Sequence, residues 1–151
     1  MALERREIVD AALSILDEVG IDSLTTRKLA ERLGVQQPAL YWHFRNKRAL
    51  LDAMNDEMLR RHHLHVTPAS GEDWRTFLEG YAGGFRAALR SHRDGARVHA
   101  GSPPVDEAGQ QTEAILAFLV SAGFPAVLAM QTVLALHNYV LGAVIDEQAD
   151  A

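Results

Sequence analysis

The chain of 151 residues contains no cysteine. Neither a disulfide framework nor a thiolate zinc site is therefore available, and a reducing cytoplasm is the compartment that we expect. The N-terminus reads MALERREIVD and carries charges where a secretory signal needs an apolar run, so export is not expected. The sequence also lacks internal repeats and low-complexity tracts, which excludes repeat architectures.

Motifs of the common enzyme classes are missing as well. The sequence has no glycine-rich phosphate loop and no GxSxG elbow, and no HExxH pair accompanies His62, His63 and His65. Such histidines commonly cap helix carbonyls or face water. A catalytic zinc takes three protein ligands and a water, so a His-rich metal-dependent hydrolase is the enzyme alternative that the cluster leaves open. Our prediction is a protein that is not an enzyme.

Residues 25–54 combine helix signals, a sharp turn and concentrated positive charge. Leu29 and Leu33 lie four apart on one short helix, and Gly34 follows where a tight turn is needed. Pro38 marks the start of a second helix, because a proline in the first turn already has a helical φ and needs no backbone partner there. This spacing predicts a helix-turn-helix.

The second helix of this unit should turn Leu40 and Phe44 inward. Its outer face then carries amide, imidazole and aromatic groups, namely Gln37, Ala39, Tyr41, Trp42 and His43. Exposed rings contribute nothing to folding, so this face indicates a partner. Glutamine can pair with an adenine edge and apolar groups can touch a thymine methyl in the major groove, so the partner that we expect is double-stranded DNA.

The charge of the same stretch supports this interpretation. Between residues 25 and 48 six basic residues stand against one acidic residue, Glu31, which gives a local charge of +5 in a chain whose net charge is −5. A segregated basic patch is typical of phosphate binding. An ordinary solvated helical hairpin is the alternative, but it leaves the turn and the exposed rings unexplained.

Hydrophobic periodicity predicts an all-α fold. The expected helices cover residues 4–19, 26–33, 38–44, 47–62, 74–89, 106–122 and 125–145. Gly83 and Gly84 interrupt the aromatic face of the fifth helix, and each costs a helix interior about 1 kcal/mol relative to alanine, so something should need the room beside Phe85. Residues 92–104 are too broken for a long helix and should hold a short helical piece and a wall of a pocket.

The last helix is apolar nearly all round, yet polar residues such as His137 lie in its middle, which hydrocarbon would penalise. We therefore expect no membrane contact and a helix buried by its own core on one side and by a second subunit on the other. The residues expected to take part are Leu134, Leu136, Val140, Leu141 and Val144, with Ala135, Gly142 and Ala143 allowing close approach. A charge at Leu141 should then yield monomers.

Three regions follow from these elements. Residues 1–46 should form a three-helix DNA-binding domain, residues 47–65 a linking helix, and residues 66–151 a ligand-binding and dimerisation domain. The turn formers Pro68 and Gly71 mark the last boundary.

The stretch also resembles the tetracycline-repressor (TetR) family of bacterial transcription regulators, and within it the tetracycline repressors proper. The blocks that carry the resemblance are TTRKLA, LGV, QPALYWH and NKRALLDA, followed more weakly by RHH, RDGARVH and LGAVIDEQ. It implies a homodimeric repressor on a palindromic operator, released by a small drug-like effector. An architectural DNA-binding protein without an effector is the alternative. Similar members continue into further helices, so we expect either a fragment or a short member.

The resemblance also implies which residues touch DNA. They are Thr26, Arg27, Gln37, Pro38, Ala39, Tyr41, Trp42, His43 and Lys47. Arg27 would read a guanine and Gln37 an adenine, while Lys47 would lie near a phosphate. Position 39 departs from the family, because the repressors commonly have a threonine there and Ala39 lacks its hydroxyl.

For the effector, the resemblance implies a site lined by His63, Tyr81, Phe85, Pro103 and Ile115. His99 would be a ligand of a Mg²⁺ ion that arrives with a tetracycline-like effector, and no intrinsic cofactor is implied. Tyr81, Pro103 and Ile115 replace an asparagine, an arginine and a glutamine of the family. Each lost amide hydrogen bond is worth about 0.5–1.5 kcal/mol. We therefore expect a planar, partly aromatic effector, with Mg-tetracycline bound more weakly than by the type members.

Overall fold

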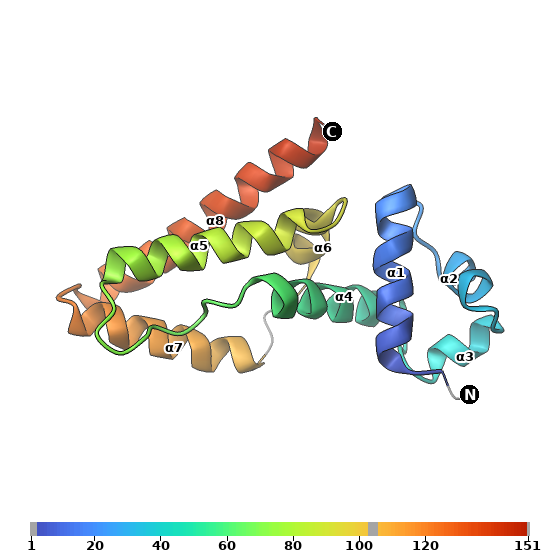
Figure 1. The fold of residues 1–151 in the computed structure, drawn as a ribbon, viewed down its shortest axis with the longest axis horizontal. Coiled ribbons are helices and arrows are strands. Elements are labelled where there is room, and N and C mark those ends of the chain that lie inside the picture. The colour runs from blue at the N-terminus through green and yellow to red at the C-terminus, as the bar shows by residue number, and fades with distance from the viewer. Residues whose placement is uncertain (1–2, 103–105, 151) are drawn as a thin grey trace.

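The computed structural model describes residues 3–102 and 106–150, and all regular elements in these residues are α-helices (Figure 1). The helices are α1 (Arg5–Val19), α2 (Thr26–Leu33), α3 (Gln37–Tyr41), α4 (Lys47–His62), α5 (Trp74–Arg90), α6 (Gly95–Gly101), α7 (Asp106–Ser121) and α8 (Ala126–Ala149). The predicted all-α class is confirmed. The short α6 lies within the segment that was expected to hold one helical piece.

Local sequence signals explain where the N-terminal helices begin and end. The Thr25 hydroxyl caps α2 by accepting a hydrogen bond from the backbone N–H of Lys28 at 3.2 Å. The Asn46 side chain caps α4 in the same way, with the N–H of Ala49 at 2.9 Å. Gly34 ends α2 at a φ of 67°, a left-handed conformation that glycine adopts without steric cost. The predicted turn between α2 and α3 is therefore present.

Apolar side chains of the first four helices share one core. Ile8 and Leu16 of α1 are 0% exposed, and Leu40 and Phe44 point into the same core as predicted. Val98 of α6 also belongs to this cluster, although it lies far along the chain. The core at the N-terminal end therefore includes part of a helix from the C-terminal half.

Two smaller apolar clusters organise the rest of the molecule. Phe77 of α5 packs with α7 and α8 in one cluster, and Phe85 and Leu89 of α5 pack with α6 and α8 in the other. Figure 1 shows the resulting elongated shape, with α2 and α3 at one end, α7 toward the other, and α6 where the end of α5 approaches α1. Helix α4 runs from the first core toward α5 and so joins the two halves.

Helix α8 is apolar on two sides, as the sequence predicts. By length and composition it could cross a membrane, and 22% of its apolar window is buried within this chain. Val140 and Val144 face the chain's own core and Leu141 lines a cavity, so their expected position at a partner interface is wrong. Leu134 and Tyr139 are 53% and 76% exposed and mark the uncovered side of the helix.

Candidate functional site

The helix-turn-helix presents its polar and aromatic groups at one end of the molecule. Gln37 begins α3, and its side-chain amide nitrogen donates a hydrogen bond to the Thr26 hydroxyl at 2.7 Å. Tyr41 and Trp42 follow with 49% and 90% of their surfaces exposed. A tryptophan this exposed has no packing role in the chain. The arrangement places two aromatic rings beside an amide that a neighbouring helix already orients.

Charged groups surround this face. Arg27 is exposed on α2 and pairs with Glu31 at 2.9 Å, and the Lys47 ammonium lies 3.5 Å from the carbonyl of Ile21. Pro38 is exposed, whereas Ala39 and His43 are half-buried beside it. The predicted DNA-contacting residues therefore come together at α2, α3 and the start of α4, and their individual contacts stay a prediction.

A cavity of about 380 Å³ lies in the other half of the molecule. Its walls come from α4, α5, α6, α7 and α8, and among the residues that the structure describes they include no aspartate, glutamate, lysine or arginine. Polar groups in the walls are imidazoles, amides and hydroxyls. Such a cavity suits a ligand that is mostly apolar and hydrogen-bonds through neutral groups.

Four of the predicted effector residues line this cavity, namely His63, Tyr81, Phe85 and His99. Ile115 does not line it, because its side chain is 2% exposed and packs with Phe77 and Leu119 in a separate apolar cluster. Pro103 lies outside the described residues.

Two polar residues of the cavity were not predicted as site residues. His137 of α8 stacks on Phe85, with ring centroids 4.7 Å apart and planes 21° apart. Asn55 of α4 is 5% exposed, and its side-chain oxygen lies 2.8 Å from Nδ1 of His99. The only sequence signal for either was a polar residue on an otherwise apolar stretch of helix.

Burial sets the protonation of the cavity imidazoles. Desolvation lowers the pKa of His63 to about 4 and that of His99 to about 4, and it also lowers the pKa of His137. All three rings are therefore neutral near physiological pH and can accept a hydrogen bond or bind a metal ion. Nε2 of His63 is buried without a hydrogen-bond partner, which leaves this nitrogen for a ligand.

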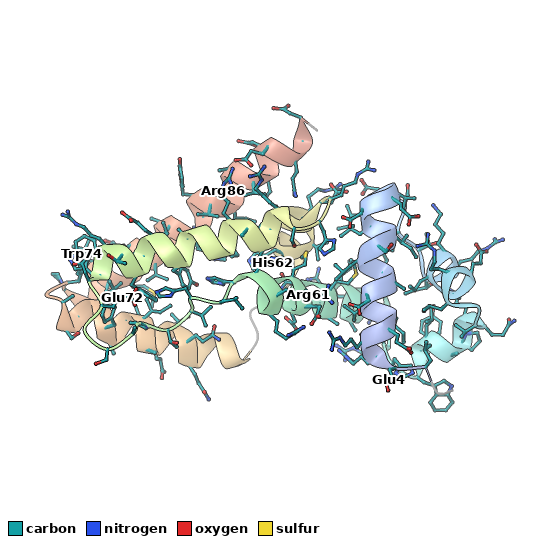
Figure 2. The ribbon with its side chains drawn as sticks, in the orientation of Figure 1. Glu4, Arg61, His62, Glu72, Trp74 and Arg86 are labelled. Atoms are coloured by element: carbon teal, nitrogen blue, oxygen red, sulfur yellow. The ribbon has the colours of Figure 1, made fainter. Side chains whose placement is uncertain are left out.

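The chain crosses α5 directly after α4, where two glycines give it room. A Cβ at Gly84 would lie 3.2 Å from Cδ2 of His63, and a Cβ at Gly80 would lie 3.1 Å from Cδ2 of His65. Gly83 faces open space instead. Figure 2 shows His62 at the end of α4, with Glu72 further along the connection toward Trp74. The predicted close approach therefore occurs at Gly84, and the approaching group is His63.

We expect alanine at the two neighbouring glycines to have opposite effects. Gly83→Ala should stabilise the protein by about 0.5–1 kcal/mol, because the helix loses a flexible residue and gains no clash. Gly84→Ala should gain less stability and weaken ligand binding, because His63 must move. Thermal melts and ligand titrations of both variants test this, and equal ligand affinity in the two would contradict it.

Helix α6 connects the cavity with the N-terminal core. His99 faces the cavity, while Asp94 accepts a hydrogen bond from the backbone N–H of Ile21 at 2.9 Å. Arg97 donates two hydrogen bonds of 2.9 Å to the carboxylate of Asp22. A ligand that shifts α6 would therefore act directly on the segment between α1 and α2.

Two family models match the chain. The model described as "Bacterial regulatory proteins, tetR family" matches residues 8–54, and "Tetracyclin repressor-like, C-terminal domain" matches residues 67–151. Among curated proteins, the chain is 54% identical over 147 residues to the tetracycline repressor protein class A from transposon 1721 of Escherichia coli. That alignment covers 97% of this chain and 68% of the relative.

Solved structures are similar over nearly the whole chain. A TetR variant from Acinetobacter baumannii AYE in complex with minocycline matches with a TM-score of 0.93 and 52% identity, over 97% of this chain and 82% of that one. A class A TetR in complex with 5a,6-anhydrotetracycline and magnesium matches with a TM-score of 0.87 and 49% identity, over 98% and 83%.

Proposed function

Because this chain belongs to the TetR family of bacterial transcription regulators, we propose that it is a repressor released from DNA by a planar, drug-like effector. It binds a two-fold symmetric operator as a homodimer and acts in the cytoplasm. It carries out no chemical reaction and holds no intrinsic cofactor. Residues 1–46 bind DNA, residues 47–65 link the two halves, and residues 66–151 bind the effector and the second subunit.

One observation carries this proposal, namely the position of α6 between the cavity and the DNA-binding unit. Its His99 lies in the cavity wall, and its Asp94 and Arg97 hold the segment that leads into α2. An architectural DNA-binding protein has no use for such a link. Effector binding can therefore bias the position of the helix-turn-helix through one short rigid element.

In the DNA-binding half we assign base reading to Arg27 and Gln37 and apolar contacts to Pro38, Tyr41 and Trp42. Thr26, His43 and Lys47 lie near phosphates. The support is the cluster of exposed rings beside an oriented amide at one end of the molecule. Ala39 provides no hydroxyl to a phosphate.

Two substitutions separate base reading from phosphate binding. Gln37→Ala should cost about 1–3 kcal/mol on an operator selected from random duplexes and relax the preference at one base pair. Lys47→Ala should weaken all duplexes alike and reduce the salt slope by about one. Fluorescence anisotropy on selected and random DNA measures both, and an equal loss on the two DNAs for Gln37→Ala would sink the assignment.

A two-fold dimer follows from the geometry of DNA reading. One helix-turn-helix offers few base contacts, whereas two recognition helices about 34–36 Å apart read two half-sites one helical turn apart. The uncovered side of α8 supplies a surface for pairing, since Leu134 and Tyr139 are exposed apolar groups on one long helix. This side also runs past the cavity, because Leu134 lines it.

The effector that we propose is planar and partly aromatic, and tetracycline chelated to Mg²⁺ is the first candidate. The residues present fit such a chelate, because Asn55 holds Nδ1 of His99 at 2.8 Å and leaves Nε2 as a neutral donor for a cation. The drug's oxygens would supply the hard ligands that Mg²⁺ prefers. His63 and Phe85 offer a hydrogen-bonding nitrogen and a ring face. Tyr81 adds bulk, so affinity should be lower than in the type members.

Titration with tetracycline, with and without Mg²⁺, tests this assignment in the wild type and in His99→Ala. We expect binding that depends on Mg²⁺ and falls by about 10–100-fold in the variant, as is usual when a metal site is disturbed. Unchanged affinity in His99→Ala would leave His99 as a wall residue. A thermal shift recorded in parallel reports binding to the folded state independently of DNA.

A further inference from the structure

His137 lies in a ring of aromatic groups that the family resemblance does not account for. Phe85 is in the centre, with His137 stacked on it at 4.7 Å and His99 against its edge at 5.0 Å. His63 completes the ring at 5.6 Å from the same phenyl group. Three imidazoles from three different segments therefore converge on one wall of the cavity.

The distance between His99 and His137 suits a shared cation. Their ring centroids are 5.3 Å apart. Two imidazoles that bind one metal ion at about 2.0–2.1 Å and roughly a right or tetrahedral angle place their centroids roughly 4.5–5.3 Å apart. The two rings therefore already stand near the separation that a common ion requires, without movement of α6 or α8.

The surroundings keep both rings available for a metal ion. Asn55 accepts the Nδ1 proton of His99, which fixes the ring and leaves Nε2 unprotonated. Burial lowers the pKa of both imidazoles, so protons do not compete with the ion near physiological pH. His137 packs face to face with Phe85, which restricts rotation of its ring.

The remaining ligands must come from outside the protein. Among the described residues no group of three or more histidines, cysteines or carboxylates could hold a metal ion alone. The cavity wall likewise offers no described carboxylate. An ion at His99 and His137 would therefore need a chelating effector that brings oxygen ligands of its own.

We propose that His137 is a second protein ligand, beside His99, for the divalent cation that enters with a chelating effector, and that the pair favours Ni²⁺, Co²⁺ or Zn²⁺ over Mg²⁺. Two imidazole nitrogens suit these ions, whereas Mg²⁺ prefers oxygen ligands and retains water. The inference rests on the proposed function, because it places the effector in the same cavity. It identifies His137 as the residue that sets the choice of cation.

The direct test compares the cation preference of the wild type with that of His137→Phe, which keeps a ring on Phe85 and removes the nitrogens. The probe is anhydrotetracycline, titrated in the presence of Mg²⁺ or Ni²⁺. The ratio of the Kd with Mg²⁺ to the Kd with Ni²⁺ should be at least about tenfold larger in the wild type. His62→Phe is the matched control, since His62 is exposed and outside the cavity wall, and it should leave the ratio unchanged. Ratios within threefold in the wild type and His137→Phe would overturn the proposal.

A spectroscopic count of ligands holds even if a variant folds poorly. Electron spin-echo modulation of the Cu²⁺ chelate should reveal two bound imidazoles in the wild type and one in His137→Phe, and a single imidazole in the wild type would refute the inference. Binding of the Mg²⁺ chelate with release of operator DNA, but without a change of ratio, would refute only the role of His137. No binding with any cation would refute the proposed effector as well.

Discussion

Replacing Tyr139 by glutamate should convert the protein from dimers to monomers and abolish tight operator binding. Tyr139 is 76% exposed on the uncovered side of α8 and does not line the cavity. In a two-fold interface each substitution appears twice, and a buried charge without a partner costs about 3–5 kcal/mol. The dimer dissociation constant should therefore rise by at least about a hundredfold.

Sedimentation velocity at micromolar concentration measures this effect. Leu64→Glu is the matched control, because Leu64 is also an exposed apolar residue, at 75%, but lies in the connection between α4 and α5. It should sediment like the wild type. Dimers of Tyr139→Glu with wild-type stability would show that the uncovered side of α8 does not pair subunits.

Asp94→Ala should separate effector binding from operator release. The Asp94 carboxylate accepts the backbone N–H of Ile21, and an unsatisfied N–H there costs about 1–3 kcal/mol. Asp94 also has a φ of 56°, where alanine is strained by about 1–2 kcal/mol more. Stability should fall by at least about 2 kcal/mol. Since α6 loses its hold on the segment before α2, the effect of ligand on operator affinity should fall by about tenfold.

Asp94→Asn is the control for this prediction. Asparagine tolerates the left-handed backbone and keeps a side-chain oxygen that can accept the N–H of Ile21. It should retain most of the stability and of the release. Denaturant melts, effector titrations and operator binding with and without effector separate the effects. Normal release in a folded Asp94→Ala protein would show that the signal does not pass through this contact.

The sequence predicts the DNA-binding end well because its signals are local. Thr25, Gly34 and Asn46 each determine a helix end through their own backbone or cap, and Leu40 with Phe44 determines which side of α3 is buried. Such features require no knowledge of distant segments. The helices and turns of this half are therefore the part of the fold that the amino-acid sequence alone predicts.

The cavity could be predicted only in part because distant helices build it. His137 and Asn55 come from α8 and α4, and periodicity alone does not show that they meet His99. Ile115 was expected in the cavity by resemblance, but rotation of α7 about its axis determines its position in a core instead. Leu141 was expected at the partner interface for the same reason, since a helix apolar all round does not reveal which side faces which neighbour.

Release of operator DNA by a metal chelate tests the central claim most directly. Wild-type protein is bound to a fluorescent operator selected from random duplexes, and anhydrotetracycline is titrated with Mg²⁺, with Ni²⁺ or with EDTA while anisotropy is recorded. The account predicts release with a divalent cation and retention of the complex in EDTA. An operator complex that persists at saturating chelate, with effector binding shown by drug fluorescence, would contradict a ligand-released repressor.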